Sequence, residues 1–150
     1  MADKLGAARL PLLERLGQGG HGRALDPAAL RDSVGRELVR LLNTRSSPHG
    51  AHPERPLSVP DYGLPDWSSS YAADVDDRQR LARTIEAAVR AFEPRLWAPR
   101  AQVFTDPDGM RRLRVQVSGS LWTGGAAWPV DYGVALDGNG AALLGAAEDP

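Results

Sequence analysis

The sequence predicts an α+β domain in which two helices pack on one face of a small, mainly antiparallel sheet. Two observations support this fold class. In residues 27–42 and 74–92, apolar residues recur at helical spacing, and over the last third of the chain they alternate with polar residues as in a strand. Helices followed by strands are typical of α+β folds, where the helices cover one side of the sheet.

Length and composition narrow the class of protein further. A chain of 150 residues, 42% of them hydrophobic, fits one small globular domain. Because it has no cysteine, disulfide frameworks, thiolate zinc sites and thiol nucleophiles are excluded. A net charge of -1 gives no overall field that favours nucleic acid. Without a membrane-length apolar run or a secretory signal pattern, we expect a cytoplasmic protein that does not insert into membranes.

The chain begins with an expected flexible arm over residues 1–26, and residues 27–150 are expected to form a single domain. The arm carries a leucine cluster followed by a glycine-rich run. This cluster consists of Leu10, Leu12, Leu13 and Leu16. Asp26-Pro27 is a helix start signal, and the spacing of the apolar residues predicts a helix over 27–42. Its other face is expected to be solvated and carries Arg31, Asp32, Arg36, Glu37 and Arg40.

A long loop is predicted from Asn43 to Ser70, because its prolines are too frequent for a helix or an inner strand. Loops of this length in compact domains are commonly functional or disordered. Asp74 then caps a second helix, which Pro94 ends at Phe92 or Glu93. The core face of this helix is formed by Leu81, Ile85, Val89 and Phe92.

Strands are predicted over residues 101–105, 111–121 and 128–136, with a weak fourth strand near Leu143. Turn signals occur at 106–109, 124–125 and 137–140. The alternation assigns one buried face to the two longest strands, formed by Leu113, Val115, Val117, Trp128, Val130, Tyr132, Val134 and Leu136.

Three patterns that carry chemistry in other proteins are weak here. His49 and His52 lie in a proline-rich loop without a third defined ligand, so we expect no metal site and no cofactor. Ser68-Ser69-Ser70 lacks the strand and flanking glycines that expose a nucleophilic serine. The glycine-rich runs at 17–22 and 124–125 lack the context of a phosphate-binding loop and are interpreted as turns.

Glu93 is the carboxylate most suited by position to catalysis, since it leaves a helix beside Pro94 and Arg95. Glycoside hydrolysis, however, needs a protonated acid and a second carboxylate at a defined separation. An arginine two residues away favours the ionised carboxylate instead. The residues therefore favour an oriented ion pair that either docks a partner or braces the corner between the helix and the next strand.

Three blocks of sequence, taken in order, resemble the TssE family of type VI secretion baseplate subunits and its phage baseplate wedge relatives, once labelled lysozymes. The blocks are Ser33 to Leu38 running into Leu41 to Arg45, then Asp61-Tyr62-Gly63-Leu64-Pro65-Asp66, then Phe92 to Leu96. The resemblance covers about Leu12 to Leu144. The sequence departs from the family's usual pattern at Pro99 and at Gly124 to Ala127. Because Pro99 cannot donate to a strand ladder, the strand there is expected to begin near Arg100 or to lie at an edge.

The resemblance implies a non-enzymatic scaffold with a fold similar to the interlocking domain of the contractile sheath. Its implied partners are the TssF-type and TssG-type wedge subunits and the sheath proteins, and its implied binding residues are Glu93, Pro94 and Arg95. Strand addition at an open sheet edge would start sheath growth. If the Glu93–Arg95 pair is exposed, Arg95→Ala should weaken assembly and change stability by only about 1 kcal/mol. Two alternatives remain: a regulatory, anti-adaptor-like binding module, and a peptidoglycan-cleaving lysozyme that uses Glu93.

The second block predicts an ordered motif within the long loop. Gly63 is suited to a positive φ, and Tyr62 and Leu64 are expected to anchor the loop on the first helix. An ordinary surface turn is the alternative at this position.

Overall fold

The computed structural model describes residues 26–46, 59–67, 74–107 and 112–144. Within them lie two α-helices, a short 3-10 helix and four strands, which confirms the predicted α+β class. The elements are α2 (Pro27–Asn43), η1 (Val59–Asp61), α3 (Val75–Phe92), β1 (Leu96–Thr105), β2 (Leu113–Thr123), β3 (Ala126–Asp137) and β4 (Gly140–Leu143). Outside the described residues lie positions 1–25 of the predicted arm, both loop histidines, the serine run and part of the 106–109 turn.

Both helices begin where an aspartate caps them. The Oδ1 atom of Asp26 accepts a hydrogen bond from Ala29 N at 2.6 Å, and Pro27 occupies the first turn of α2. In α3, Asp74 Oδ1 accepts from Asp76 N at 3.0 Å. The start signals in the sequence are therefore confirmed by side chains that satisfy amides left open at the helix ends.

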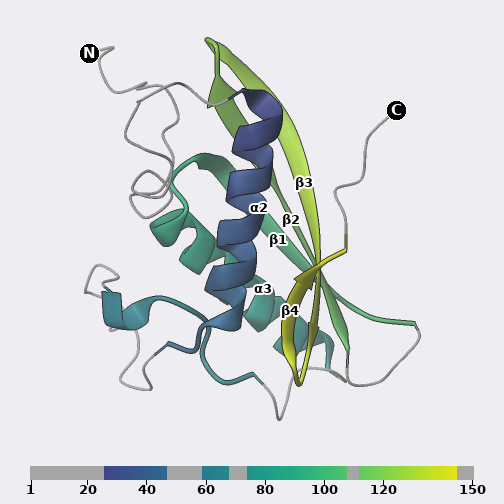
Figure 1. The fold of residues 1–150 in the computed structure, drawn as a ribbon. Helices are drawn as coiled ribbons and strands as arrows, with labels where there is room; N and C mark the ends of the chain where they lie inside the picture. The colour runs from purple at the N-terminus through teal and green to yellow at the C-terminus, as the bar shows by residue number, and fades with distance from the viewer. Residues whose placement is uncertain (1–25, 47–58, 68–73, 108–111, 145–150) are drawn as a thin grey trace.

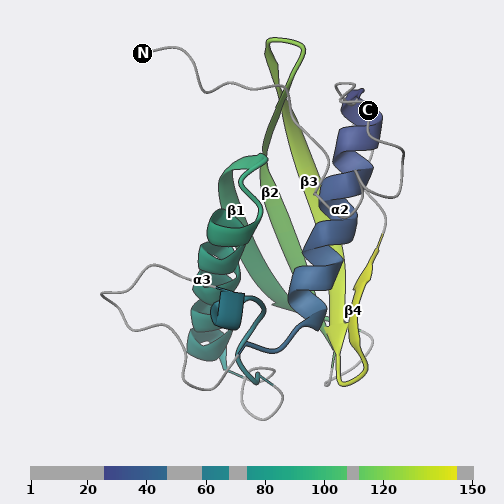
Figure 2. The ribbon, with the colours of Figure 1, turned by 60° about the vertical axis from the view of Figure 1, so that its left-hand side comes forward.

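The four strands form an antiparallel meander in the order β1-β2-β3-β4, so β1 and β4 are its edges. Figures 1 and 2 show both helices on the same face of this sheet, α3 beside β1 and α2 beside β3 and β4. Gly124 and Gly125, at φ 60° and 81°, form the two-residue turn between β2 and β3. The opposite face of the sheet carries no helix from the described parts of the chain.

The core lies between the two helices and the inner face of the sheet. Leucine and valine side chains of α2 and α3 pack there against alternate residues of β2 and β3. The fully buried members include Leu30, Val34, Leu38, Ile85, Leu113, Val115, Val134 and Leu136. Neither described helix is both long and apolar enough to cross a membrane.

Two details of the predicted strands were wrong. β1 begins at Leu96, ahead of the expected start near Arg100, although the expectation of an edge strand is confirmed. A bulge between Trp97 and Arg100, with Ala98 at φ 48°, accommodates Pro99 without ending the strand. Trp128 was expected in the core but is 48% exposed, because it faces the start of α2 at Pro27 and Ala28, where the helical layer ends.

Candidate functional site

Glu93, Pro94 and Arg95 form the corner between α3 and β1. Glu93 N–H donates to Val89 O at 2.8 Å and so completes the last turn of α3. Pro94 has no amide hydrogen to continue the helix. Leu96 N–H then donates to Glu93 O at 3.1 Å, which turns the chain into β1. The backbone of this motif is therefore fixed on both sides.

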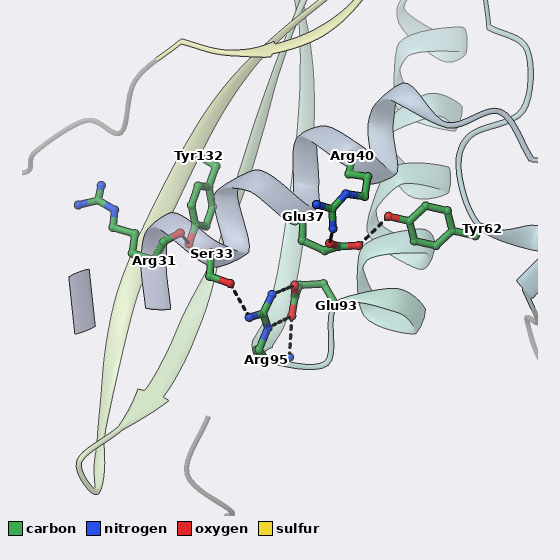
Figure 3. Close-up of polar contacts among 8 residues, drawn as sticks. All are labelled: Arg31, Ser33, Glu37, Arg40, Tyr62, Glu93, Arg95 and Tyr132. Atoms are coloured by element: carbon green, nitrogen blue, oxygen red, sulfur yellow. Dashed lines mark hydrogen bonds and ion pairs between the residues drawn. The ribbon is translucent and has the colours of Figure 1, made fainter. Parts of the chain in front are cut away.

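The side chains at the corner form a two-pronged ion pair. Arg95 Nε donates to Glu93 Oε1 at 2.7 Å, and Arg95 Nη2 lies 2.6 Å from Glu93 Oε2. The Arg95 backbone N–H also donates to Oε1, at 3.1 Å. The remaining guanidinium nitrogen, Nη1, donates to Ser33 Oγ of α2 at 2.9 Å, as Figure 3 shows. One arginine thus joins both helices and the first strand.

Burial distinguishes this corner from an ordinary surface pair. The Glu93 side chain is 2% exposed and that of Arg95 is 12% exposed. The expected cost of only about 1 kcal/mol for Arg95→Ala applied to an exposed pair. Because this pair is buried, that condition is not met. Both carboxylate oxygens of Glu93 accept hydrogen bonds from Arg95, so neither is directed at solvent as a general acid would need. The exposed residue of the motif is Pro94.

The loop motif at 61–66 is attached to the end of α2. Leu64 N–H donates to Thr44 O at 2.9 Å, and Ser46 N–H donates to Leu64 O at 3.0 Å, which makes a short parallel bridge. Gly63 adopts φ 111°, and a Cβ there would lie 2.2 Å from Thr44 O. Only glycine allows this close approach of the two backbones. Leu64 itself is buried in the core.

Tyr62 makes the second attachment. Its hydroxyl donates to Glu37 Oε1 at 2.7 Å, and its ring meets Phe92 edge-on with centroids 5.2 Å apart. Burial, followed by the hydrogen bond to Glu37, raises the pKa of Tyr62 above its usual value of 10. The predicted anchoring of Tyr62 and Leu64 on the first helix is confirmed. The expected solvated state of Glu37 is wrong, because it receives both Tyr62 and Arg40.

The two motifs converge on α2. The corner reaches it at Ser33, and the loop reaches it at Glu37 and Thr44. Sequence reasoning missed the role of Ser33, whose signal is a polar residue on the apolar face of an amphipathic helix. It also missed Asn43, whose side chain bonds both backbone groups of Ala141 in β4, at 2.9 Å and 2.7 Å.

In this fold, Arg95 links the corner to α2 through Ser33, and Tyr62 links the loop motif to α2 through Glu37. The family of baseplate wedge protein gp25 matches residues 28–126, a span that includes all three sequence blocks. The chain belongs to this family, and the resemblance drawn from its sequence is confirmed. Its role is a structural one in a baseplate, in association with other baseplate proteins. No curated protein and no solved structure gives a significant match.

Proposed function

We propose that this chain is the TssE-type, non-enzymatic subunit of a type VI secretion baseplate, joining the wedge subunits and starting sheath assembly by strand addition. Membership of the baseplate wedge family supports the part of this proposal that places the chain in a baseplate. The observation that carries the finer proposal is a difference between the two edges of the sheet, since strand addition needs an edge with backbone groups directed outward.

At the β4 edge, the outward backbone groups of Ala141 are already used within the chain. Asn43 Nδ2 donates to Ala141 O at 2.9 Å, and Ala141 N–H donates to Asn43 Oδ1 at 2.7 Å. The side chain thereby imitates a neighbouring strand. Gly140 at φ 132° lets the strand approach Asn43, because a Cβ there would lie 2.3 Å from Oδ1. A partner strand would first have to displace this amide.

At the β1 edge, the first half is irregular and the second half is regular. The bulge at Ala98 and Pro99 interrupts the first half. Asp106 N–H donates to Arg112 O, so the backbone groups of Asp106 point toward β2. Along an antiparallel pair, the backbone groups of successive residues point alternately toward the neighbouring strand and away from it. Val103 and Thr105 therefore present their backbone N–H and C=O groups outward. We assign the edge that receives a sheath strand to residues 101–105. Within this edge, the outward N–H of Ala101 lies 3.4 Å from Glu86 Oε2.

Proline scanning of this edge tests strand addition. Thr105→Pro removes an outward donor from an exposed residue, and Thr105→Ala, which keeps the amide, is the matched control. We expect both variants to keep the melting temperature of the monomer, and only the proline variant to stop sheath formation in cells. Normal sheath frequency with proline at both Val103 and Thr105 would reject strand addition at this edge.

For the wedge contact, we propose that partners bind the exposed Pro94 side of the corner, while Glu93 and Arg95 give that corner its shape. Pro94→Ala should then reduce co-purification of the wedge subunits without unfolding the protein. Arg95→Lys keeps the charge and loses the two-pronged geometry, so it separates shape from charge. Unchanged wedge recovery with Pro94→Ala and Arg95→Lys would contradict this contact. Release of peptidoglycan fragments by the wild type would overturn the non-enzymatic assignment.

A further inference from the structure

A groove of about 240 Å³ lies between the first turn of α2 and the ends of β2 and β3. Figure 1 shows this turn of α2 beside the upper part of the β2–β3 hairpin. Pro27 and Ala28 form one wall, Trp128 and Pro129 contribute to the other, and Leu121 and Val130 are its buried members. Arg31 is the one charged residue among those that line it. The groove is thus an apolar surface at the end of the helical layer.

The groove is unsuited to a cofactor and suited to a few apolar side chains. Its volume is below the roughly 300–1,000 Å³ of typical small-molecule sites. Trp128 is 48% exposed although Val130 and Tyr132, the next residues on its side of β3, are buried. A large apolar surface that continues the core in this way is typical of a contact site.

The chain itself provides an occupant close by. Residues that precede α2 leave the described structure at Asp26, next to the groove wall formed by Pro27. Upstream lies the segment 10–16, which carries the four leucines of the cluster. Residues 17–25 connect it to Asp26 and span up to about 30 Å when extended, which is ample for a return to the groove.

We propose that the leucine segment, residues 10–16, binds in this groove against Trp128 of the same chain. Attachment through a short connection gives the segment a high effective concentration at the groove, in the millimolar range for short flexible linkers. A second copy of the chain would have to compete at its far lower free concentration. The inference is independent of the baseplate partners proposed above, because both the segment and the groove belong to this chain.

Engineered cysteines test the contact directly, because the chain has none of its own. Leu13→Cys is combined with Thr123→Cys, which lines the groove, or with Gln116→Cys, an exposed control on the opposite face of β2. We expect the intramolecular disulfide to form at least about tenfold faster in the groove pair, as an effective-concentration difference predicts. Equal rates would overturn the proposal. Disulfides between chains that increase with protein concentration would replace it with docking of a second copy.

Tryptophan fluorescence gives an independent measurement on the full-length chain. The contribution of Trp128 is obtained as the difference between spectra with and without Trp128→Phe. Leu12→Asp combined with Leu13→Asp should shift that contribution to longer wavelength, because charged residues would leave the groove and expose the indole to water. Leu5→Asp, upstream of the segment, is the matched control. An unchanged Trp128 contribution in the double variant with unchanged circular dichroism would overturn the proposal.

Discussion

The two motifs that the sequence singled out contain ion pairs of similar length in opposite environments. At the corner, Arg95 lies 2.6 Å from Glu93, and both side chains are largely buried. Beside the loop, Arg45 lies 2.5 Å from Asp66, and the side chains are 62% and 67% exposed. Distance alone would rank the two pairs as equal. Burial separates them, because water screens the exposed pair and leaves the buried one to be satisfied by the protein alone.

This difference shows what each motif contributes. The corner depends on its charges, since removal of one would leave the other buried without its partner. The loop depends on backbone geometry and apolar contacts, through Gly63, Leu64 and the Tyr62 ring. The two motifs should therefore respond to different kinds of substitution, and four experiments examine that expectation.

The largest effect is expected at the corner. Glu93→Gln keeps the size of the side chain but removes the carboxylate that pairs with the buried Arg95 guanidinium, and should lower the free energy of unfolding by about 3–5 kcal/mol. Urea denaturation monitored by circular dichroism measures the loss. A loss below about 1 kcal/mol would mean that water enters the corner and that its burial is not maintained in solution.

A smaller but substantial effect is expected from the backbone of the loop. Gly63→Ala should cost at least about 2 kcal/mol, because the residue has φ 111° and its Cβ would collide with Thr44 O. Gly124→Ala is the matched control, since φ is also positive there but no atom lies within 4 Å of the added Cβ. Its cost should be about 1 kcal/mol. Equal losses in the two variants would show that the contact with Thr44 contributes nothing.

The dependence of stability on alkaline pH tests the two tyrosines that contact α2. Burial raises the pKa of Tyr62 and of Tyr132, whose hydroxyl donates to Arg31 O at 3.0 Å. The folded state then holds protons that the unfolded state releases above pH 10, so stability is complete below pH 10 and falls above it. Each tyrosine can contribute a slope of at most about 1.4 kcal/mol per pH unit. Tyr132→Phe and Tyr62→Phe should each flatten this fall by a similar amount in urea titrations between pH 10 and 11.

The smallest effect is expected at the exposed pair. Asp66→Asn should change the free energy of unfolding by less than about 0.5 kcal/mol, and 0.5 M salt should remove even that difference. Thermal melts at low and high salt provide the measurement. A loss comparable to that of Glu93→Gln would remove burial as the explanation for the contrast between the two motifs.

Local patterns in the sequence predicted most of the fold. The capped start at Asp26 and the spacing that ends at Phe92 define both helices, because helix signals lie within a few residues of each other. Alternation also assigned the buried face of β2 and β3, but it could not show where the helical layer above them ends. The predicted burial of Trp128 was therefore wrong, although the face of the sheet predicted for it was correct.

The candidate site was less predictable, because its defining contacts join distant parts of the chain. Glu93 and Arg95 are close in sequence, and their pairing was expected. Arg95 also bonds Ser33, which lies 62 positions away in the sequence, and no local pattern carries that information. The same holds for Asn43, which is 98 positions from Ala141. Gly63 was found in advance because a positive φ leaves its signal in a single residue.

The packing of Leu96 over Gly119 links two positions in the evolution of the chain. A Cβ at Gly119 would lie 2.7 Å from Leu96 Cδ1 and 2.9 Å from Trp97 O. Any larger residue at 119 would need a smaller side chain at 96 and a displaced bulge. Among relatives that keep this bulge, the two positions should therefore covary, and a designer who replaces one of them will have to replace the other in the same step.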